Sequence, residues 1–172
     1  QALVQSSSEV QYDFEILKAV EKVNANQKLH LVEKIKAYYK NDLQGKHFAL
    51  WGLAFKPNTD DIREAPALSI IDALTSAGAT VTAYDPEAKS NVKAQIGDKI
   101  KFAENQYHAL EGAAALIIAT EWSEFRTPDF ERMEQELKHK IIFDGRNLFD
   151  VAKMNDLGYH YESIGRADSN KL

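Results

Sequence analysis

The sequence predicts a doubly wound α/β domain with a parallel sheet of about six strands, preceded by a long helical arm. Three observations support this prediction. After Gly45, short apolar runs alternate with helical stretches; several of those stretches end in glycine; and the region before Gly45 holds one long run with helical spacing. Continuously apolar strands separated by helices are typical of a parallel sheet that is covered on both faces.

The arm is predicted at residues 13–41, which contain neither glycine nor proline. Asp13 is placed to cap this helix, and apolar side chains from Leu17 onward recur at helical spacing. A continuous helix would span ~40 Å at 1.5 Å per residue. Asn24 and Gln27 interrupt the apolar stripe, either as a solvated turn of an ordinary core helix or as amides that set the register of an arm packed against another domain or subunit. We favour the arm.

The strands and helices after Gly45 follow from the change in periodicity. The predicted strands are residues 47–54, 80–85, 99–102, 114–120, 140–145 and 159–164. The predicted helices are residues 65–78, 87–97, 105–113, 128–138 and 151–158. We therefore expect an arm at residues 1–42 and an α/β domain at residues 43–172, whose last six residues look disordered.

The composition excludes several classes of protein. A net charge of −5 argues against a broad surface for nucleic acid or for an anionic membrane. The absence of cysteine excludes a disulfide framework and a cysteine nucleophile within this chain, and the five histidines lack the spacing of metal ligands. No apolar run approaches the ~20 residues that cross a bilayer. The N-terminus lacks a secretory signal and a starting methionine, so we expect part of a longer cytoplasmic protein.

The turn at residues 51–66 is the first candidate site, because ligands of doubly wound sheets bind beyond the carboxyl ends of the strands. Gly52 is not followed by the further glycines of a G-x-G-x-x-G dinucleotide site. Lys56 offers a point charge for a phosphate and Arg63 a bidentate fork, and amides at the start of the next helix would add to both. In the alternative interpretation, these two cations only neutralise the acidic residues of the same turn.

Other strand ends carry three further candidates. Arg146 follows the fifth predicted strand and either closes over an anion or makes a structural contact with Asp144. Asp85 ends the second strand, where a dinucleotide fold places its ribose-binding acid, but Asp-Pro also starts helices and we favour that role. Trp122 follows the fourth strand and is interpreted as a packing residue rather than a platform for a base.

Five stretches occur in order and together resemble one known family. They are "GLAFKPNTDDIREAPAL", "AYDPEA", "TEWSEF", "IIFDGRNLFD" and "YHYESIGR". The chain resembles the C-terminal, UDP-sugar-binding, Rossmann-like domain of UDP-glucose 6-dehydrogenases, in the UDP-glucose/GDP-mannose dehydrogenase family. The helix with "VNANQK" looks like the central helical region of the family, which links two Rossmann-like domains and forms the dimer.

This resemblance implies the NAD-dependent oxidation of UDP-glucose to UDP-glucuronate by two hydride transfers, with a covalent cysteine adduct between them. In the family, the NAD-binding domain and the catalytic cysteine precede such a segment, and "QALVQ" looks like the stretch after the cysteine loop. The resemblance therefore implies a fragment that is inactive alone and forms a homodimer through the arm. The alternatives are a GDP-mannose or UDP-N-acetylhexosamine dehydrogenase fragment, or a non-catalytic α/β nucleotide-binding module.

The resemblance also implies roles for four residues. Phe55 and Lys56 match positions that contact the UDP-sugar, and Arg146 matches an arginine that reaches the substrate from a later strand. Arg63 matches an arginine that reaches toward NAD held mainly by the other domain. No catalytic residue and no metal ligand is expected within this chain.

Overall fold

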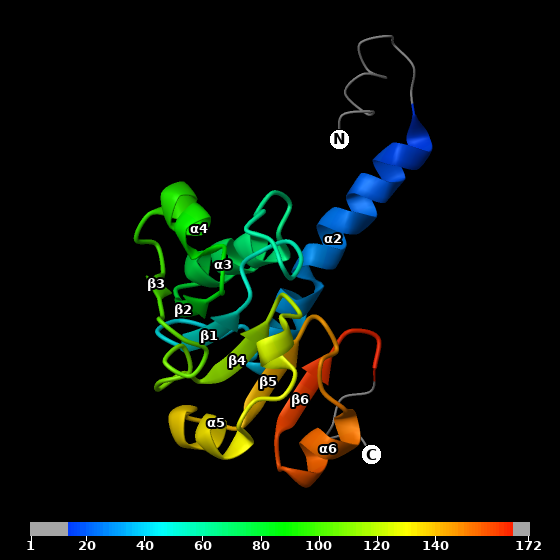
Figure 1. Cartoon of the computed structure of the whole chain (residues 1–172). Helices are drawn as coiled ribbons and strands as arrows, with labels where there is room; N and C mark the ends of the chain where they lie inside the picture. Colours follow the sequence, from blue (N-terminus) through cyan, green and yellow to red (C-terminus); the bar gives the residue numbers. More distant parts are fainter. Residues whose placement is uncertain (1–13, 167–172) are drawn as a thin grey trace.

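The computed structural model describes residues 14–166 and arranges helices on both faces of a six-stranded sheet (Figure 1). The helices are α2 (Glu15–Tyr38), α3 (Pro66–Ser76), α4 (Lys89–Ile96), α5 (Phe130–Glu136) and α6 (Val151–Asp156), and a 3-10 turn spans Ser123–Phe125. The strands are β1 (His47–Trp51), β2 (Thr80–Tyr84), β3 (Lys101–Phe102), β4 (Ala115–Ile118), β5 (Ile141–Asp144) and β6 (His160–Ser163).

The order of the strands is β3-β2-β1-β4-β5-β6, and every neighbouring pair is parallel. The chain moves outward from β1 to β3 and then returns to β4 on the other side of β1. Helices α3 and α4 lie on one side of the sheet, and α5 and α6 lie on the other (Figure 1). The doubly wound prediction is confirmed, and β1 and β4 flank the point where strand order reverses, which is where such sheets bind ligands.

All six predicted strands are present, but each is shorter than its apolar run. The first run was predicted to continue through Ala54, whereas β1 ends at Trp51. Leu53 and Ala54 are fully buried although they lie beyond the strand. Residues 47–54 form one apolar run because the turn after β1 also packs into the core. The apolar pattern therefore indicated which residues are buried, but not where the strand ends.

The predicted helix at residues 105–113 is wrong, because this segment forms consecutive turns between β3 and β4. The side chain of Asn105 accepts hydrogen bonds from the amides of Tyr107 and His108, at 2.9 and 3.0 Å. This is the pattern of a helix N-cap, so Asn105 does not oppose a helix. The amide of Leu110 donates to the carbonyl of Tyr107, three residues earlier, at 2.8 Å, as in a turn rather than an α-helix. Ala109 and Leu110 are buried, so their apolar side chains had the pattern expected of a helix that covers the sheet.

Helix α2 changes environment along its length. Its first half projects away from the sheet in Figure 1, and Ile16 and Val23 expose 73% and 63% of their surface. Its second half packs against α3 and β5, and Leu31, Val32 and Ile35 belong to the same hydrophobic core as the strands. The arm is thus continuous with the core of the sheet at one end only.

Two predictions about the ends of the chain concern residues that the structure does not describe. The expected cap Asp13 and the expected disordered tail at residues 167–172 both lie outside residues 14–166. Within the described part, Phe14 precedes the first turn of α2 and makes no side-chain cap. The domain boundary at residue 42 stays a prediction.

Candidate functional site

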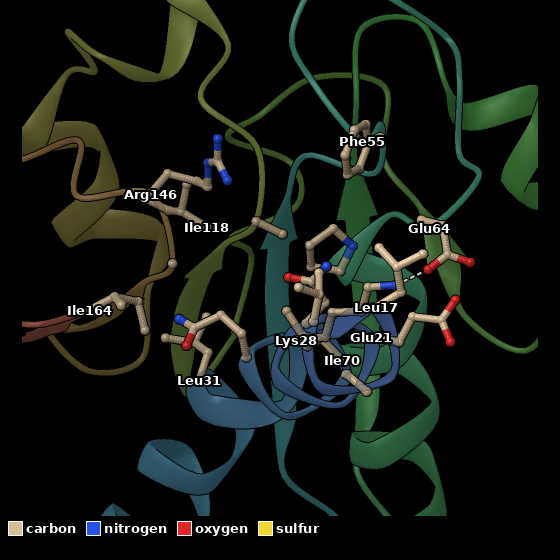
Figure 2. A pocket seen from close by; sticks show the side chains of 17 residues that line it. Leu17, Glu21, Lys28, Leu31, Phe55, Glu64, Ile70, Ile118, Arg146 and Ile164 are labelled. Atoms are coloured by element: carbon tan, nitrogen blue, oxygen red, sulfur yellow. Dashed lines mark hydrogen bonds and ion pairs between the residues drawn. The ribbon is translucent and has the colours of Figure 1, made fainter. Parts of the chain in front are cut away.

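A cavity of about 990 Å³ lies between α2 and the carboxyl ends of β1, β4, β5 and β6 (Figure 2). Its floor is apolar and includes Leu31, Ile70 and Ile118. Figure 2 shows Phe55 and Arg146 at its upper rim in the view, on the turns that follow β1 and β5. The structure therefore brings two predicted site residues that are 91 positions apart in the sequence to one cavity.

The turn after β1 begins at Gly52, which has a φ of +90°. A Cβ atom at this position would lie 2.5 Å from the Cβ of Thr120, two residues beyond the end of β4. Both the backbone conformation and the close approach therefore require glycine. This glycine serves the packing of two strand ends rather than a phosphate-binding loop.

The amides of this turn are already engaged within the protein. The amide of Gly52 donates to the carbonyl of Tyr84 at 2.9 Å, and that of Phe55 donates to the carbonyl of Asp61 at 2.8 Å. The amides of Leu53 and Ala54 donate to one oxygen of Asp85, at 2.6 and 3.0 Å. Four consecutive N–H groups are thus unavailable to a phosphate, unlike those of a glycine-rich dinucleotide turn.

Asp85 is 3% exposed and joins three loops at the carboxyl edge of the sheet. The oxygen that accepts from the turn after β1 also accepts from Trp122 Nε1 at 3.0 Å. Its other oxygen accepts from the amides of Glu87 and Ala88, at 2.9 and 2.7 Å. Asp85 starts a turn and Trp122 packs at 6% exposure, so the structural interpretations of both residues are confirmed.

Phe55 and Lys56 follow this anchored stretch directly. Phe55 is 40% exposed and lines the cavity. Lys56 Nζ lies 5.3 Å from the centre of the Phe55 ring, which is a cation–π distance. The Lys56 side chain does not line the cavity, and among residues 14–166 it makes no ion pair. The predicted pair therefore sits together, with the aromatic ring inside the cavity and the ammonium group beside it.

Arg63 lies apart from the cavity and 87% of its side chain is exposed. Its Nε and Nη2 atoms donate to the two carboxylate oxygens of Asp61, at 2.9 and 2.7 Å. The hydrogen bond from Arg63 lowers the pKa of Asp61 to about 2, and the same pairing raises the pKa of Arg63. Neutralisation of an acid within its own turn, one of the two sequence interpretations, is therefore what Arg63 does in this structure.

Arg146 is positioned by a buried carboxylate at the end of β5. Asp144 is fully buried and accepts from the amides of Arg146 and Leu148, at 2.8 and 2.7 Å, and from the Tyr161 hydroxyl at 2.8 Å. Burial raises the pKa of Asp144, although these hydrogen bonds oppose the shift. The contact of Asp144 with Arg146 is to the backbone, which leaves the guanidinium group for another partner.

That partner is Glu121, which the sequence interpretation missed. Both Nε and Nη2 of Arg146 donate to the Glu121 carboxylate, the latter at 2.6 Å. Burial would raise the pKa of Glu121, but the hydrogen bonds and charge of Arg146, with a smaller contribution from Arg126, outweigh it and lower the pKa. The available signal was positional, because Glu121 follows β4, and β4 pairs with β5.

Helix α2 supplies the remaining wall of the cavity. Asn24 and Gln27, which interrupt the apolar stripe in the sequence, line it. Lys28 forms an ion pair with Glu64, drawn as the dashed line in Figure 2, and Glu64 has a φ of +61°. This pair joins the arm to the loop that precedes α3. Whether the two amides set the register of the arm stays a prediction.

The described residues contain neither a metal-binding cluster nor a membrane-spanning helix. Within residues 14–166, no three histidine, aspartate or glutamate side chains lie together as a metal site would require. No helix in that range has the length and apolar character that crossing a bilayer needs.

The fold and the cavity define a doubly wound α/β domain that presents side chains, rather than a glycine-rich backbone turn, to a ligand at its switch point. The chain belongs to the UDP-glucose/GDP-mannose dehydrogenase family, whose UDP binding domain matches residues 49–151. The matched segment includes the turns after β1 and β5. It also includes Asp85, Glu121 and Asp144.

Similar proteins agree with this assignment. The chain is 44% identical to the UDP-glucose 6-dehydrogenase of Pseudomonas aeruginosa, over 96% of this chain and 38% of that protein. It is 39% identical to UDP-glucose 6-dehydrogenase TuaD of Bacillus subtilis, over 96% of this chain and 36% of that protein. A solved UDP-glucose dehydrogenase from Pyrobaculum islandicum superposes with a TM-score of 0.79 at 30% identity, over 96% of this chain and 36% of that one. The chain thus spans well under half the length of these relatives.

Proposed function

We propose that this chain is the nucleotide-sugar-binding part of an NAD-dependent UDP-glucose 6-dehydrogenase, which oxidises UDP-glucose to UDP-glucuronate. The observation that carries the proposal is the meeting of Phe55 and Arg146 at one large cavity, in a chain that matches the UDP binding domain of the family. A volume of about 990 Å³ lies at the upper end of the range for small-molecule sites.

The side chains around the cavity suggest how a UDP-sugar is bound. Arg146 presents a guanidinium group suited to the diphosphate, because arginine matches phosphate geometry with paired N–H donors. The Phe55 ring offers an apolar face for the planar or the sugar part of the ligand. Lys56 stands beside that ring as a second positive charge for the phosphates. Asn24 and Gln27 add neutral donors and acceptors that suit sugar hydroxyl groups.

NAD does not fit the switch point of this sheet, because the amides after β1 and the carboxylate of Asp85 are occupied by the protein itself. We propose that NAD is held mainly by another part of the whole protein and that Arg63, exposed at the surface, reaches toward it. When bound there, NAD would accept the hydride. Because this chain has no cysteine, a thiol-dependent step also needs residues from elsewhere.

Calorimetric titration with UDP tests the binding role. We expect the unaltered chain to bind UDP, and Arg146→Ala to weaken binding by about tenfold or more, since a hydrogen bond to a charged group contributes ~1.5–3 kcal/mol. Lys56→Ala should weaken binding less, because its side chain lies beside the cavity. Lys99→Ala serves as a charge-matched control, because Lys99 pairs with Asp72 before β3, away from the carboxyl edge of the sheet.

Three results would contradict the proposal. Undetectable UDP binding, or equal binding by all variants, would place the nucleotide site elsewhere. Tighter binding of GDP than of UDP would favour a dehydrogenase with a different base preference. Steady NADH formation by the purified chain, supplied with NAD and UDP-glucose, would show that it carries the redox chemistry alone.

We also propose a homodimer through the first half of α2. Ile16, Val20 and Val23 follow helical spacing and expose 73%, 48% and 63% of their surface, so they line one face of the helix as an apolar strip that a partner could cover. Sedimentation should show a dimer of the unaltered chain, and Val23→Asp should shift it toward monomer. A monomeric unaltered chain at high concentration would exclude this interface.

A further inference from the structure

The pairing of Arg146 with Glu121 fixes one edge of the guanidinium group. Nε and Nη2 both point at the Glu121 carboxylate, in the side-on arrangement that matches two donors to two acceptor oxygens. An arginine carries five N–H donors, and this arrangement uses two of them. In the part of the chain that the structure describes, Nη1 makes no hydrogen bond with the protein, so that end of the group remains for a ligand.

The orientation of Arg146 matters more here than in a glycine-rich nucleotide site. The four amides of residues 52–55 donate within the protein, so the turn after β1 contributes no backbone cradle to a phosphate. The charge of a diphosphate must then be met by side chains. A long, half-exposed arginine has many rotamers, and a partner that selects one of them before the ligand arrives removes part of the ordering cost.

Glu121 also carries a negative charge, which would repel a diphosphate if it acted alone. Arg146 contacts its carboxylate directly, and Arg126 makes a smaller electrostatic contribution that also lowers the pKa of Glu121. Because Arg146 cancels the charge of Glu121, the positive charge at this edge of the sheet comes from other cations. Lys56, on the turn after β1, makes no ion pair within residues 14–166 and adds to that charge. The Arg146–Glu121 pair therefore does not repel an anion while Glu121 is ionised.

We propose that Glu121 is a positioning residue for the diphosphate of the nucleotide sugar. It holds the Nε and Nη2 edge of Arg146 so that the Nη1 end faces the cavity. This role rests on the proposed function, because it assumes that Arg146 contacts the phosphates of a bound UDP-sugar. The two residues extend from neighbouring parallel strands, β4 and β5, so the sheet itself sets their separation.

A double-mutant cycle with UDP as the probe tests this role in the whole chain. Glu121→Gln keeps the size of the side chain but removes the charge-assisted fork, and we expect UDP affinity to fall by about five- to tenfold. The loss should vanish when Arg146→Ala is already present, because the two residues act as one unit. Affinity for uridine, followed by NMR titration, should not change, since uridine has no phosphate. Thermal unfolding should also change little, because the pair is partly exposed.

Glu124→Gln is the matched control, because it removes a negative charge from the same loop. Glu124 accepts from the Tyr84 hydroxyl and does not contact Arg146. Equal or tighter UDP binding by Glu121→Gln would overturn the proposal and show that Glu121 competes with the ligand for Arg146. If both glutamate variants changed UDP affinity equally, the effect would come from the lost negative charge rather than from the contact with Arg146, and the proposal would be overturned.

The same cycle separates this inference from the proposed function. If Arg146→Ala weakens UDP binding but Glu121→Gln does not, the nucleotide site stands and the positioning role fails. If the unaltered chain does not bind UDP, or if Arg146→Ala binds it normally, both the proposed site and the positioning role fail.

Discussion

The turns after β1 and after β5 are both anchored by a buried aspartate, but the aspartate comes from a different place in each. Each begins beside a buried aspartate that accepts backbone amides, and each ends in a cation at the carboxyl edge of the sheet. The turn after β1 is anchored by Asp85, which directly follows the neighbouring strand β2. The turn after β5 is anchored by Asp144, which is the last residue of β5 itself. The first turn is thus held from a neighbouring strand, and the second is held locally.

The arginines of the two turns show the reverse arrangement: the one on the first turn is paired locally, and the one on the second is paired across strands. Arg63, on the first turn, pairs with Asp61 two residues away and is directed into solvent. Arg146, on the second turn, pairs with Glu121 from the adjacent strand and stays at the cavity. A cation that is held across strands is placed relative to the sheet, and hence relative to a ligand there. A cation paired within its own turn moves with that turn. Charge and sequence position alone therefore do not identify the arginine that faces the cavity; its ion-pair partner does.

The largest expected effect separates the two buried aspartates. Asparagine at position 85 retains one acceptor oxygen, so two or three of the five donors would lose their partner, and each buried donor left unsatisfied costs ~1–3 kcal/mol. Asp85→Asn should therefore lower the free energy of unfolding in urea by at least about 2 kcal/mol. Asp144→Asn should cost less, about 1–2 kcal/mol, because fewer donors lose a partner and burial opposes its charge. Equal costs would remove the distinction between the two anchors.

A second prediction contrasts how the two turns respond to pH. The pKa of Asp144 is raised by burial, so its contribution to stability is fully present below its unfolded pKa and is lost as pH rises through its folded pKa. The destabilisation caused by Asp144→Asn should consequently shrink between pH 4 and pH 7, as urea unfolding at several pH values would show. A penalty that grows over this range would mean that the carboxylate, rather than the acid, is the favoured form in the fold.

The smallest expected effect concerns Asp61 and has the opposite sign. Because its pKa is lowered to about 2, the stability it contributes is present above its unfolded pKa and is lost as pH falls toward 2. NMR titration of the Asp61 carboxyl group should report that low pKa in the unaltered chain. In Arg63→Ala, the pKa should return toward ~3.9, the value of an unperturbed aspartate. An unchanged pKa would show that the local pair does not persist in solution.

Much of the fold could be predicted from apolar patterning. All six predicted strands and four of the five helices predicted after Gly45 are present among the described residues. The central strands were recognisable because they are covered on both faces and form continuous apolar runs. Strand ends were misplaced where the turn after β1 is itself buried. The predicted helix at residues 105–113 failed because backbone bonds in this segment, such as that from Leu110 to Tyr107, span three residues as in turns, a difference too local for periodicity to detect.

The candidate site was predicted in its residues but not in its contacts. Lys56 and Arg146 were assigned to the carboxyl edge of the sheet from position and charge, and Phe55 mainly from the family resemblance. The structure places all three at that edge. The partner of Arg146 was missed because Glu121 lies 25 positions away, and only the pairing of β4 with β5 makes them neighbours. The contribution of α2 to the cavity was likewise hidden, since its amides look like an interruption of an apolar stripe.

The sequence by itself determined the order of the strands, the family and the edge of the sheet that carries the candidate site. These follow from hydrophobic periodicity and from motifs that are contiguous in the chain. Only the tertiary structure decided which amides remain for a ligand, which arginine faces the cavity and which carboxylate holds it. Those outcomes depend on distances between strands that are remote in sequence. Hydrogen bonds and ion pairs fall off over a few ångströms, so they are settled by packing rather than by composition.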